Sequence, residues 1–97
     1  MTKLELNDKV AELYGELNFK YASKYLNIKI FLIDDWSRLM GLAVDNGICI
    51  HIYEDCVMCA KPYSMMPTKE FYENHESPQA TTKYAIAMAL VKSAEDK

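Results

Sequence analysis

Residues 34–60 read DDWSRLMGLAVDNGICIHIYEDCVMCA, and this stretch decides the fold. Its first part has apolar residues at helical spacing, namely Trp36, Leu39, Met40, Ala43 and Val44. Asp34 or Asp35 can cap the start of such a helix, and Gly47 suits its end. We therefore expect a helix over 34–47, with an apolar face headed by Trp36 directed toward the core.

The second part of the stretch alternates as β-strands do. The residues of its two faces are Ile48, Ile50 and Ile52 on one side and Cys49, His51 and Tyr53 on the other. Glu54-Asp55 separates this strand from CVMCAKPY, an arrangement that predicts a β-hairpin. Both faces can be buried if helices cover both sides of the sheet.

Two further helices flank this unit. Thr2 and Glu5 fit a capping box, and an apolar stripe follows at Leu6, Val10, Leu13 and Leu17. A last helix is expected to start at Ser77-Pro78, with an apolar face at Ala80, Tyr84, Ala87, Met88 and Val91. Residues 19–33 fit either a helix or a strand, and residues 62–78 read as a connection with one helical turn around TKEFYENH. The sequence predicts one α+β domain over 1–97, in which a short antiparallel sheet with a hairpin packs against three or more helices.

Composition and charge narrow the range of functional classes to which the protein can belong. The chain has 97 residues, of which 51% are hydrophobic and 26% charged, with a net charge of −3. We expect no membrane span, because no apolar run approaches roughly 20 residues, and no signal peptide, because charges interrupt MTKLELNDK. Three cysteines, an odd number, favour a reducing cytoplasm. The acidic balance argues against direct nucleic-acid binding and suits a basic partner.

The cysteines and histidines raise the question of a metal site or an active site. Cys56 and Cys59 form a C-x-x-C that Cys49, His51 and His75 could complete. Residues three apart in a strand point to opposite faces, and no second pair of ligands is present. We interpret the cysteines as buried structural residues and expect no metal and no cofactor. The two histidines have no nucleophile at a readable spacing, so we do not expect an enzyme.

Acidic residues cluster in three places. Glu5, Asp8 and Glu12 recur at helical spacing, within an arc of roughly 80° that also holds Glu16. A carboxylate row of this kind can occupy a basic groove made for DNA phosphates. The other interpretation, a solvated helix face, stays open. The candidate partner-binding residues are Glu5, Asp8, Glu12, Glu54, Asp55, Glu70, Glu73 and Glu76.

Two resemblances extend this interpretation. The segments LELNDKVAELYG, DDWSRLMGLAVDNGICIHI and ESPQATTKYAIAMALV, in this order, resemble the small phage and prophage α-β-α sandwich domains of unknown function. The length and the opening MTKLELNDKVAELYG also resemble prophage-encoded type I-F anti-CRISPR proteins. This second resemblance implies a cytoplasmic inhibitor in a bacterial host. Its partner would be the crRNA-guided surveillance complex, and in the DNA-mimic subgroup the inhibitor occupies basic residues of the Cas subunits near the site that reads the protospacer-adjacent motif.

The sequence thus predicts a phage or prophage CRISPR-Cas inhibitor that blocks target DNA binding through an acidic, DNA-mimicking surface. The alternative is a phage anti-defence protein that binds a small ligand or nucleotide in a pocket. A deep pocket containing His51 or the helix start at Pro78 would favour this alternative. A small hydrolase is a third hypothesis.

Overall fold

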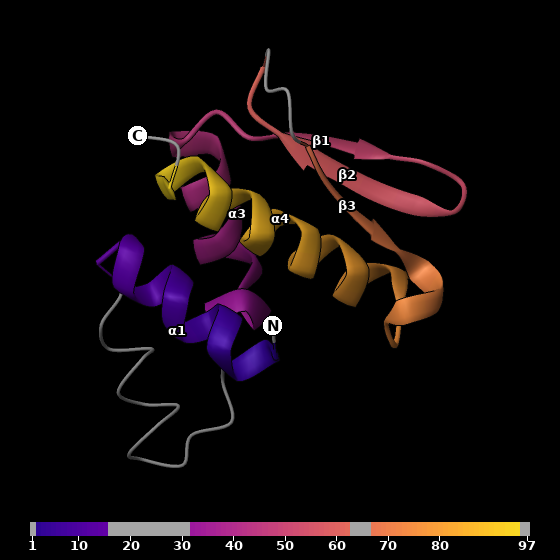
Figure 1. The fold of residues 1–97 in the computed structure, drawn as a ribbon, viewed down its shortest axis with the longest axis horizontal. Helices are drawn as coiled ribbons and strands as arrows, with labels where there is room; N and C mark the ends of the chain where they lie inside the picture. Colours follow the sequence, from indigo (N-terminus) through magenta and orange to yellow (C-terminus); the bar gives the residue numbers. More distant parts are fainter. Residues whose placement is uncertain (1, 16–31, 63–66, 96–97) are drawn as a thin grey trace.

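A computed structural model describes residues 2–15, 32–62 and 67–95. In chain order the elements are α1 (Lys3–Leu13), the 3-10 helix η1 (Leu32–Asp34), α3 (Trp36–Asp45), β1 (Cys49–Ile52), β2 (Cys56–Ala60), β3 (Thr68–Phe71), the 3-10 helix η2 (Tyr72–Asn74) and α4 (Pro78–Glu95) (Figure 1). The three strands form an antiparallel sheet in the order β1-β2-β3. This arrangement confirms the α+β class, with the hairpin and three helices, of which α4 packs against the sheet.

Helix α4 is the centre of the structure. It contacts β2 and β3 on one side and also packs against α1 and α3, and Figure 1 shows it running between the sheet and α1. Buried side chains occur around most of its circumference: Thr81, Ala85, Ile86, Ala87, Ala89, Leu90, Val91 and Ser93. A helix that is buried on several sides is typical of a core element. None of the described helices combines the length and the apolar character needed to cross a bilayer.

Short-range caps fix the ends of the helices as the sequence predicts. Thr2 Oγ1 accepts the Glu5 backbone N–H at 3.2 Å, and Asp35 Oδ1 accepts the Arg38 N–H at 3.1 Å. Ser77 Oγ accepts the Ala80 N–H at 3.1 Å at the start of α4. Gly47, with φ of +67°, follows α3 in the left-handed conformation that glycine adopts without strain. These boundaries are confirmed.

The core between α1 and η1 contains a buried amide. Leu6 and Val10 of α1 are fully buried, as predicted, whereas Leu13 is 38% exposed. Asn7 is also fully buried, and its Oδ1 accepts the Leu32 backbone N–H at 2.6 Å. The expectation for residues 19–33 lies outside the described residues except at Leu32 and Ile33, which belong to η1, and Leu17 lies outside them as well.

The sheet has one face toward α4. Val57 and Cys59 on β2 are buried, and the antiparallel register sets Thr68 opposite Cys59. The condition for burying both faces of β1, helices on both sides of the sheet, is not met there, and His51 and Ile52 are exposed. The physical reason is position: α4 lies against β2 and β3, and β1 is the strand farther out.

Two other expectations need correction. Trp36 is 38% exposed and Val44 is 73% exposed, so fewer residues of α3 face the core than its apolar pattern predicts. The buried residues of α3 are Leu39 and Ala43, one turn apart, on the side that meets α4. Within TKEFYENH the expected helical turn is present as the 3-10 helix η2, but residues 68–71, expected to be part of a connection, form strand β3.

Candidate functional site

Five of the predicted partner-binding residues gather where the β1–β2 hairpin meets η2. The Tyr72 N–H donates to the Asp55 carbonyl oxygen at 3.2 Å, and the Tyr72 hydroxyl donates to the Tyr53 carbonyl oxygen at 2.9 Å. These two bonds hold the hairpin tip against the segment that carries the later acids. We call this group the acidic end; its members are Glu54, Asp55, Glu70, Glu73 and Glu76.

Most carboxylates of the acidic end face water. Glu54, Asp55, Glu73 and Glu76 are exposed, and Glu70 is partly buried. Glu70 Oε1 lies 3.3 Å from His75 Nε2, a contact that becomes an ion pair when the imidazole is protonated. Exposed carboxylates are accessible to a basic partner, so the acidic end can act as an electrostatic contact surface.

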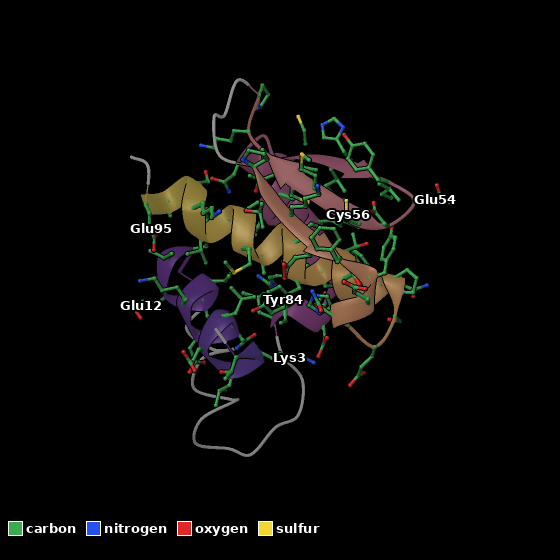
Figure 2. All side chains as sticks on the ribbon, turned by 45° about the vertical axis from the view of Figure 1, so that its right-hand side comes forward. Lys3, Glu12, Glu54, Cys56, Tyr84 and Glu95 are labelled. Carbon is green, nitrogen blue, oxygen red and sulfur yellow. The ribbon has the colours of Figure 1, made fainter. Side chains whose placement is uncertain are left out.

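The other three predicted residues form a separate group on α1, which we call the α1 row: Glu5, Asp8 and Glu12. Glu5 and Glu12 are exposed, and Asp8 is partly buried. Glu5 Oε1 also accepts the Thr2 hydroxyl at 3.0 Å, which ties it to the start of the helix. Figure 2 shows Glu12 and Glu54 on opposite sides of the molecule, so the eight acids form two groups. Glu16 lies outside the described residues.

Acids of both groups affect the pKa of Tyr84 on α4. Burial raises the pKa of its hydroxyl, and the negative charges of Glu70 and Glu5 raise this pKa further. The ring of Tyr84 lies 4.9 Å from the ring of His75, measured between centroids. Tyr84 therefore remains a neutral hydroxyl at physiological pH, between the acidic end and the first acid of the α1 row.

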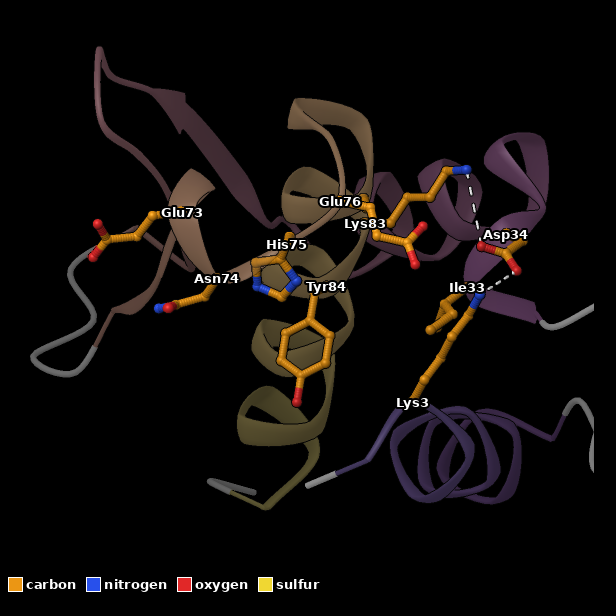
Figure 3. Close-up of a pocket in the computed structure, with 10 residues that line it drawn as sticks. Lys3, Ile33, Asp34, Glu73, Asn74, His75, Glu76, Lys83 and Tyr84 are labelled. Atoms are coloured by element: carbon orange, nitrogen blue, oxygen red, sulfur yellow. Dashed lines mark hydrogen bonds and ion pairs between the residues drawn. The ribbon is translucent and has the colours of Figure 1, made fainter.

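A pocket of about 490 Å³ opens beside the acidic end (Figure 3). Four parts of the chain form it: the start of α1, η1, the segment from η2 to α4, and the first turns of α4. The residues that line it are Lys3, Ile33, Asp34, Glu73, Asn74, His75, Glu76, Ala80, Lys83 and Tyr84. Its volume falls in the range of about 300–1,000 Å³ typical of small-molecule sites.

Asp34 is shared by two ammonium groups on one wall of the pocket. Its carboxylate lies 2.7 Å from Lys3 Nζ and 4.0 Å from Lys83 Nζ (Figure 3). Lys83, whose side chain is 19% exposed, also has its Nζ 5.2 Å from the centroid of the Trp36 ring. Within the described parts of the chain no hydrogen bond of the Lys83 ammonium is found, so it has donors available for an anionic group.

No protein-family model matches the chain, and neither does any curated protein or solved structure. Its function is therefore inferred from the chemistry of the acidic end and the pocket.

The cysteines take the positions predicted for them in the hairpin. Cys56 pairs with Phe71 and Cys59 with Thr68, so the two thiols lie on opposite faces of β2. Both are buried, whereas Cys49 is partly exposed. Burial raises the pKa of Cys59 to about 12, which keeps it a thiol at neutral pH. Across the residues that the structure covers, no group of three or more potential metal ligands comes together.

Sequence reasoning did not find the pocket. Lys3, Asp34, His75 and Lys83 are far apart in the chain and belong to no local motif. The helix start named in the alternative does contribute, through Ala80 in the first turn of α4. His51 does not: it lies on exposed β1, with its ring stacked 6.4 Å from that of Tyr53.

Proposed function

We propose that this protein inhibits a type I-F CRISPR surveillance complex in the cytoplasm of a bacterial host. It would do so by presenting acids to the basic residues of Cas subunits that otherwise hold target DNA. The observation that supports this proposal best is the acidic end, in which Tyr72 holds the hairpin tip with Glu54 and Asp55 next to the segment that carries Glu73. No catalytic step and no cofactor is needed, because the inhibitor acts by occupying the site.

The dimensions of the protein suit this role. Its longest extent is 37 Å, comparable with one turn of B-DNA at about 34–36 Å. Glu12 of the α1 row and Glu54 of the acidic end lie on opposite sides of the molecule (Figure 2). Two separated groups of negative charge can meet two parts of an extended basic groove.

The decisive experiment measures target-DNA binding by the purified surveillance complex with and without saturating inhibitor. We expect the inhibitor and the DNA to exclude each other, and inhibition to weaken as salt rises, since exposed charges are screened over about 8 Å at 0.15 M ionic strength. If the complex binds DNA at full affinity in the presence of excess inhibitor, the proposal is lost.

Charge reversals then locate the interface. Glu54→Lys with Asp55→Lys reverses the hairpin tip, and a second variant reverses Glu5, Asp8 and Glu12. Single exposed charges contribute under about 1 kcal/mol, so they are reversed in groups. Thermal melting accompanies the α1 variant, because Glu5 also takes part in the cap.

The matched control for the hairpin tip is Asp45→Lys with Glu95→Lys. Both residues are exposed and lie outside the two acidic groups, and this variant changes the net charge by the same amount. The proposal requires that at least one acidic-group variant inhibits less than the control. Equal inhibition by all three variants would reduce the hairpin tip and the α1 row to a solvated surface.

A second candidate function is supported by the pocket. Lys83 offers donors for a phosphate or carboxylate, and Tyr84 and His75 offer rings on which a base can stack. A nucleotide is therefore the ligand class to test, by calorimetric titration of a nucleotide series into the protein. Lys83→Met should abolish nucleotide binding and leave exclusion of DNA from the surveillance complex unchanged, which separates the two functions.

A further inference from the structure

We propose that β1 is a dimerisation edge, at which two copies of this chain pair strand against strand around His51. The two three-stranded sheets then become one continuous antiparallel sheet of six strands. This inference is independent of the proposed inhibitor function and uses a different surface.

The outer edge of β1 carries backbone groups that the sheet does not use. The Tyr53 N–H donates to the Cys56 carbonyl oxygen at 2.9 Å, so the polar backbone groups of Tyr53 face β2. These groups alternate in direction along an antiparallel strand, so those of Ile50 and Ile52 face outward. In the sheet formed by the described residues, β1 pairs with β2 along its inner edge, and no described strand pairs with its outer edge. Unpaired N–H and C=O groups in a row are a template for another strand.

The two edges of the sheet differ in how they are protected. On β3, Pro67 precedes the strand, and Lys69 and Glu70 place charges within it. Charges and proline are the usual means of preventing a strand from joining another chain. The β1 sequence CIHI has neither, and Ile52 is 71% exposed at its end. The unprotected edge is thus also the one that exposes a large aliphatic side chain.

A second copy is the occupant that this edge fits best, because the strand is complementary to itself. With a two-fold axis at His51, the outward groups of Ile50 meet those of Ile52 in the second copy, and the reverse pair forms symmetrically. Both isoleucines share the α4 side of the sheet, since they lie opposite Cys59 and Val57. The pairing therefore covers Ile52 with an aliphatic neighbour. The hairpin tips with Glu54 and Asp55 point away from each other in this register, so their charges do not oppose the contact.

The first test is the mass of the protein in solution as a function of concentration. Sedimentation velocity should show the 11.2 kDa chain passing to a species of twice that mass as concentration rises. Ile52→Lys should raise the dimer dissociation constant at least tenfold, because it replaces the aliphatic partner of Ile50 in the second copy by a charge. Val44→Lys is the matched control: Val44 is 73% exposed, on α3, and its replacement should leave the dimer unchanged.

The second test fixes the register. In this arrangement His51 faces His51 of the second copy in a non-hydrogen-bonded pair, with Cα atoms about 4.5 Å apart, within disulfide range. His51→Cys, made together with Cys49→Ser, should form a covalent dimer under mild oxidation. Lys69→Cys on the protected β3 edge, in the same background, should not.

Three results would overturn the proposal. One is a wild-type chain that stays monomeric to millimolar concentration. Another is a dimer that Ile52→Lys does not weaken more than Val44→Lys. The last is a Lys69→Cys variant that crosslinks as readily as His51→Cys. Circular dichroism of each variant verifies that the fold is retained.

Discussion

The hydroxyl of Tyr72 donates a 2.9 Å hydrogen bond to the backbone carbonyl of Tyr53, and so connects the β1–β2 hairpin to the turn after β3. The Tyr72 N–H makes a second bond, to the Asp55 carbonyl. One residue outside the hairpin thus determines where the hairpin tip lies. Because Glu54 and Asp55 are at that tip and Glu73 follows Tyr72, the same contact sets the spacing of the acidic end.

Replacing Tyr72 by phenylalanine should loosen the acidic end with little loss of stability. The hydrogen bond is exposed, so its removal should lower the free energy of unfolding by about 0.5–1 kcal/mol, the lower part of the usual range. Urea denaturation measures the change. Tyr53→Phe is the control, because Tyr53 contributes its backbone carbonyl and not its hydroxyl. Equal effects of the two substitutions would contradict the role given to Tyr72.

Substitution of Asn7 should lower the free energy of unfolding more than substitution of most other polar residues. It is fully buried, and its Oδ1 accepts the Leu32 N–H at 2.6 Å. Asn7→Ala leaves that N–H buried without its partner, which should cost about 1–3 kcal/mol in urea denaturation. Asp8→Ala, at the next and only partly buried position, is the comparison. A loss at Asn7 no greater than at Asp8 would show that the amide does not hold η1 against α1.

Replacing Trp36 by alanine should cost less stability than replacing Leu90, although tryptophan is the larger residue. Trp36 is 38% exposed and lies under the Lys83 ammonium, so Trp36→Ala should cost about 1–2 kcal/mol from partial burial and the cation–π contact. Leu90 is fully buried in α4, and Leu90→Ala should cost about 2–5 kcal/mol. Thermal or chemical denaturation of both variants tests this order, and the reverse order would place Trp36 in the core after all.

Stability should fall at alkaline pH through Cys59. Its pKa rises from the ordinary 9.0 to about 12 on folding, because burial disfavours the thiolate. Below pH 9 both states keep the proton; above it the unfolded chain ionises first, so the free energy of unfolding falls until the folded thiol also ionises. The slope is at most about 1.4 kcal/mol per pH unit. Cys59→Ala should show a shallower decline between pH 9 and 11, and an identical slope would rule out this contribution.

Much of the fold follows from short-range patterns. The caps at Thr2, Asp35 and Ser77 and the glycine after α3 involve residues close in the chain, and their chemistry is readable in sequence. Strand β3 is different, because TKEF is short and half charged, and it becomes a strand through pairing with β2. The exposure of Trp36 and Val44 is likewise set by how much of α3 its neighbours cover, which an apolar pattern does not specify.

The candidate sites also have parts that the sequence predicts and parts that depend on the tertiary fold. The clustering of Glu54 with Asp55, and of Glu70 with Glu73 and Glu76, is visible in the sequence. Their union depends on Tyr72, whose side chain reaches back nineteen positions to Tyr53. The pocket depends still more on the tertiary fold, since Lys3, Asp34 and Lys83 meet across α1, η1 and α4. No periodicity or motif in the sequence predicts that these three residues lie together, so the pocket can be found when the packing of the helices is known.

The central position of α4 has a consequence for biosynthesis. The hairpin, β3, α1 and α3 all precede α4 in the chain, yet the sheet and the two helices pack on it. As the ribosome extends the chain, each of these earlier elements emerges before the surface that buries it. The core can close when residues 78–95 have left the exit tunnel, so we expect folding to be late and all at once, with a protease-sensitive nascent chain until then.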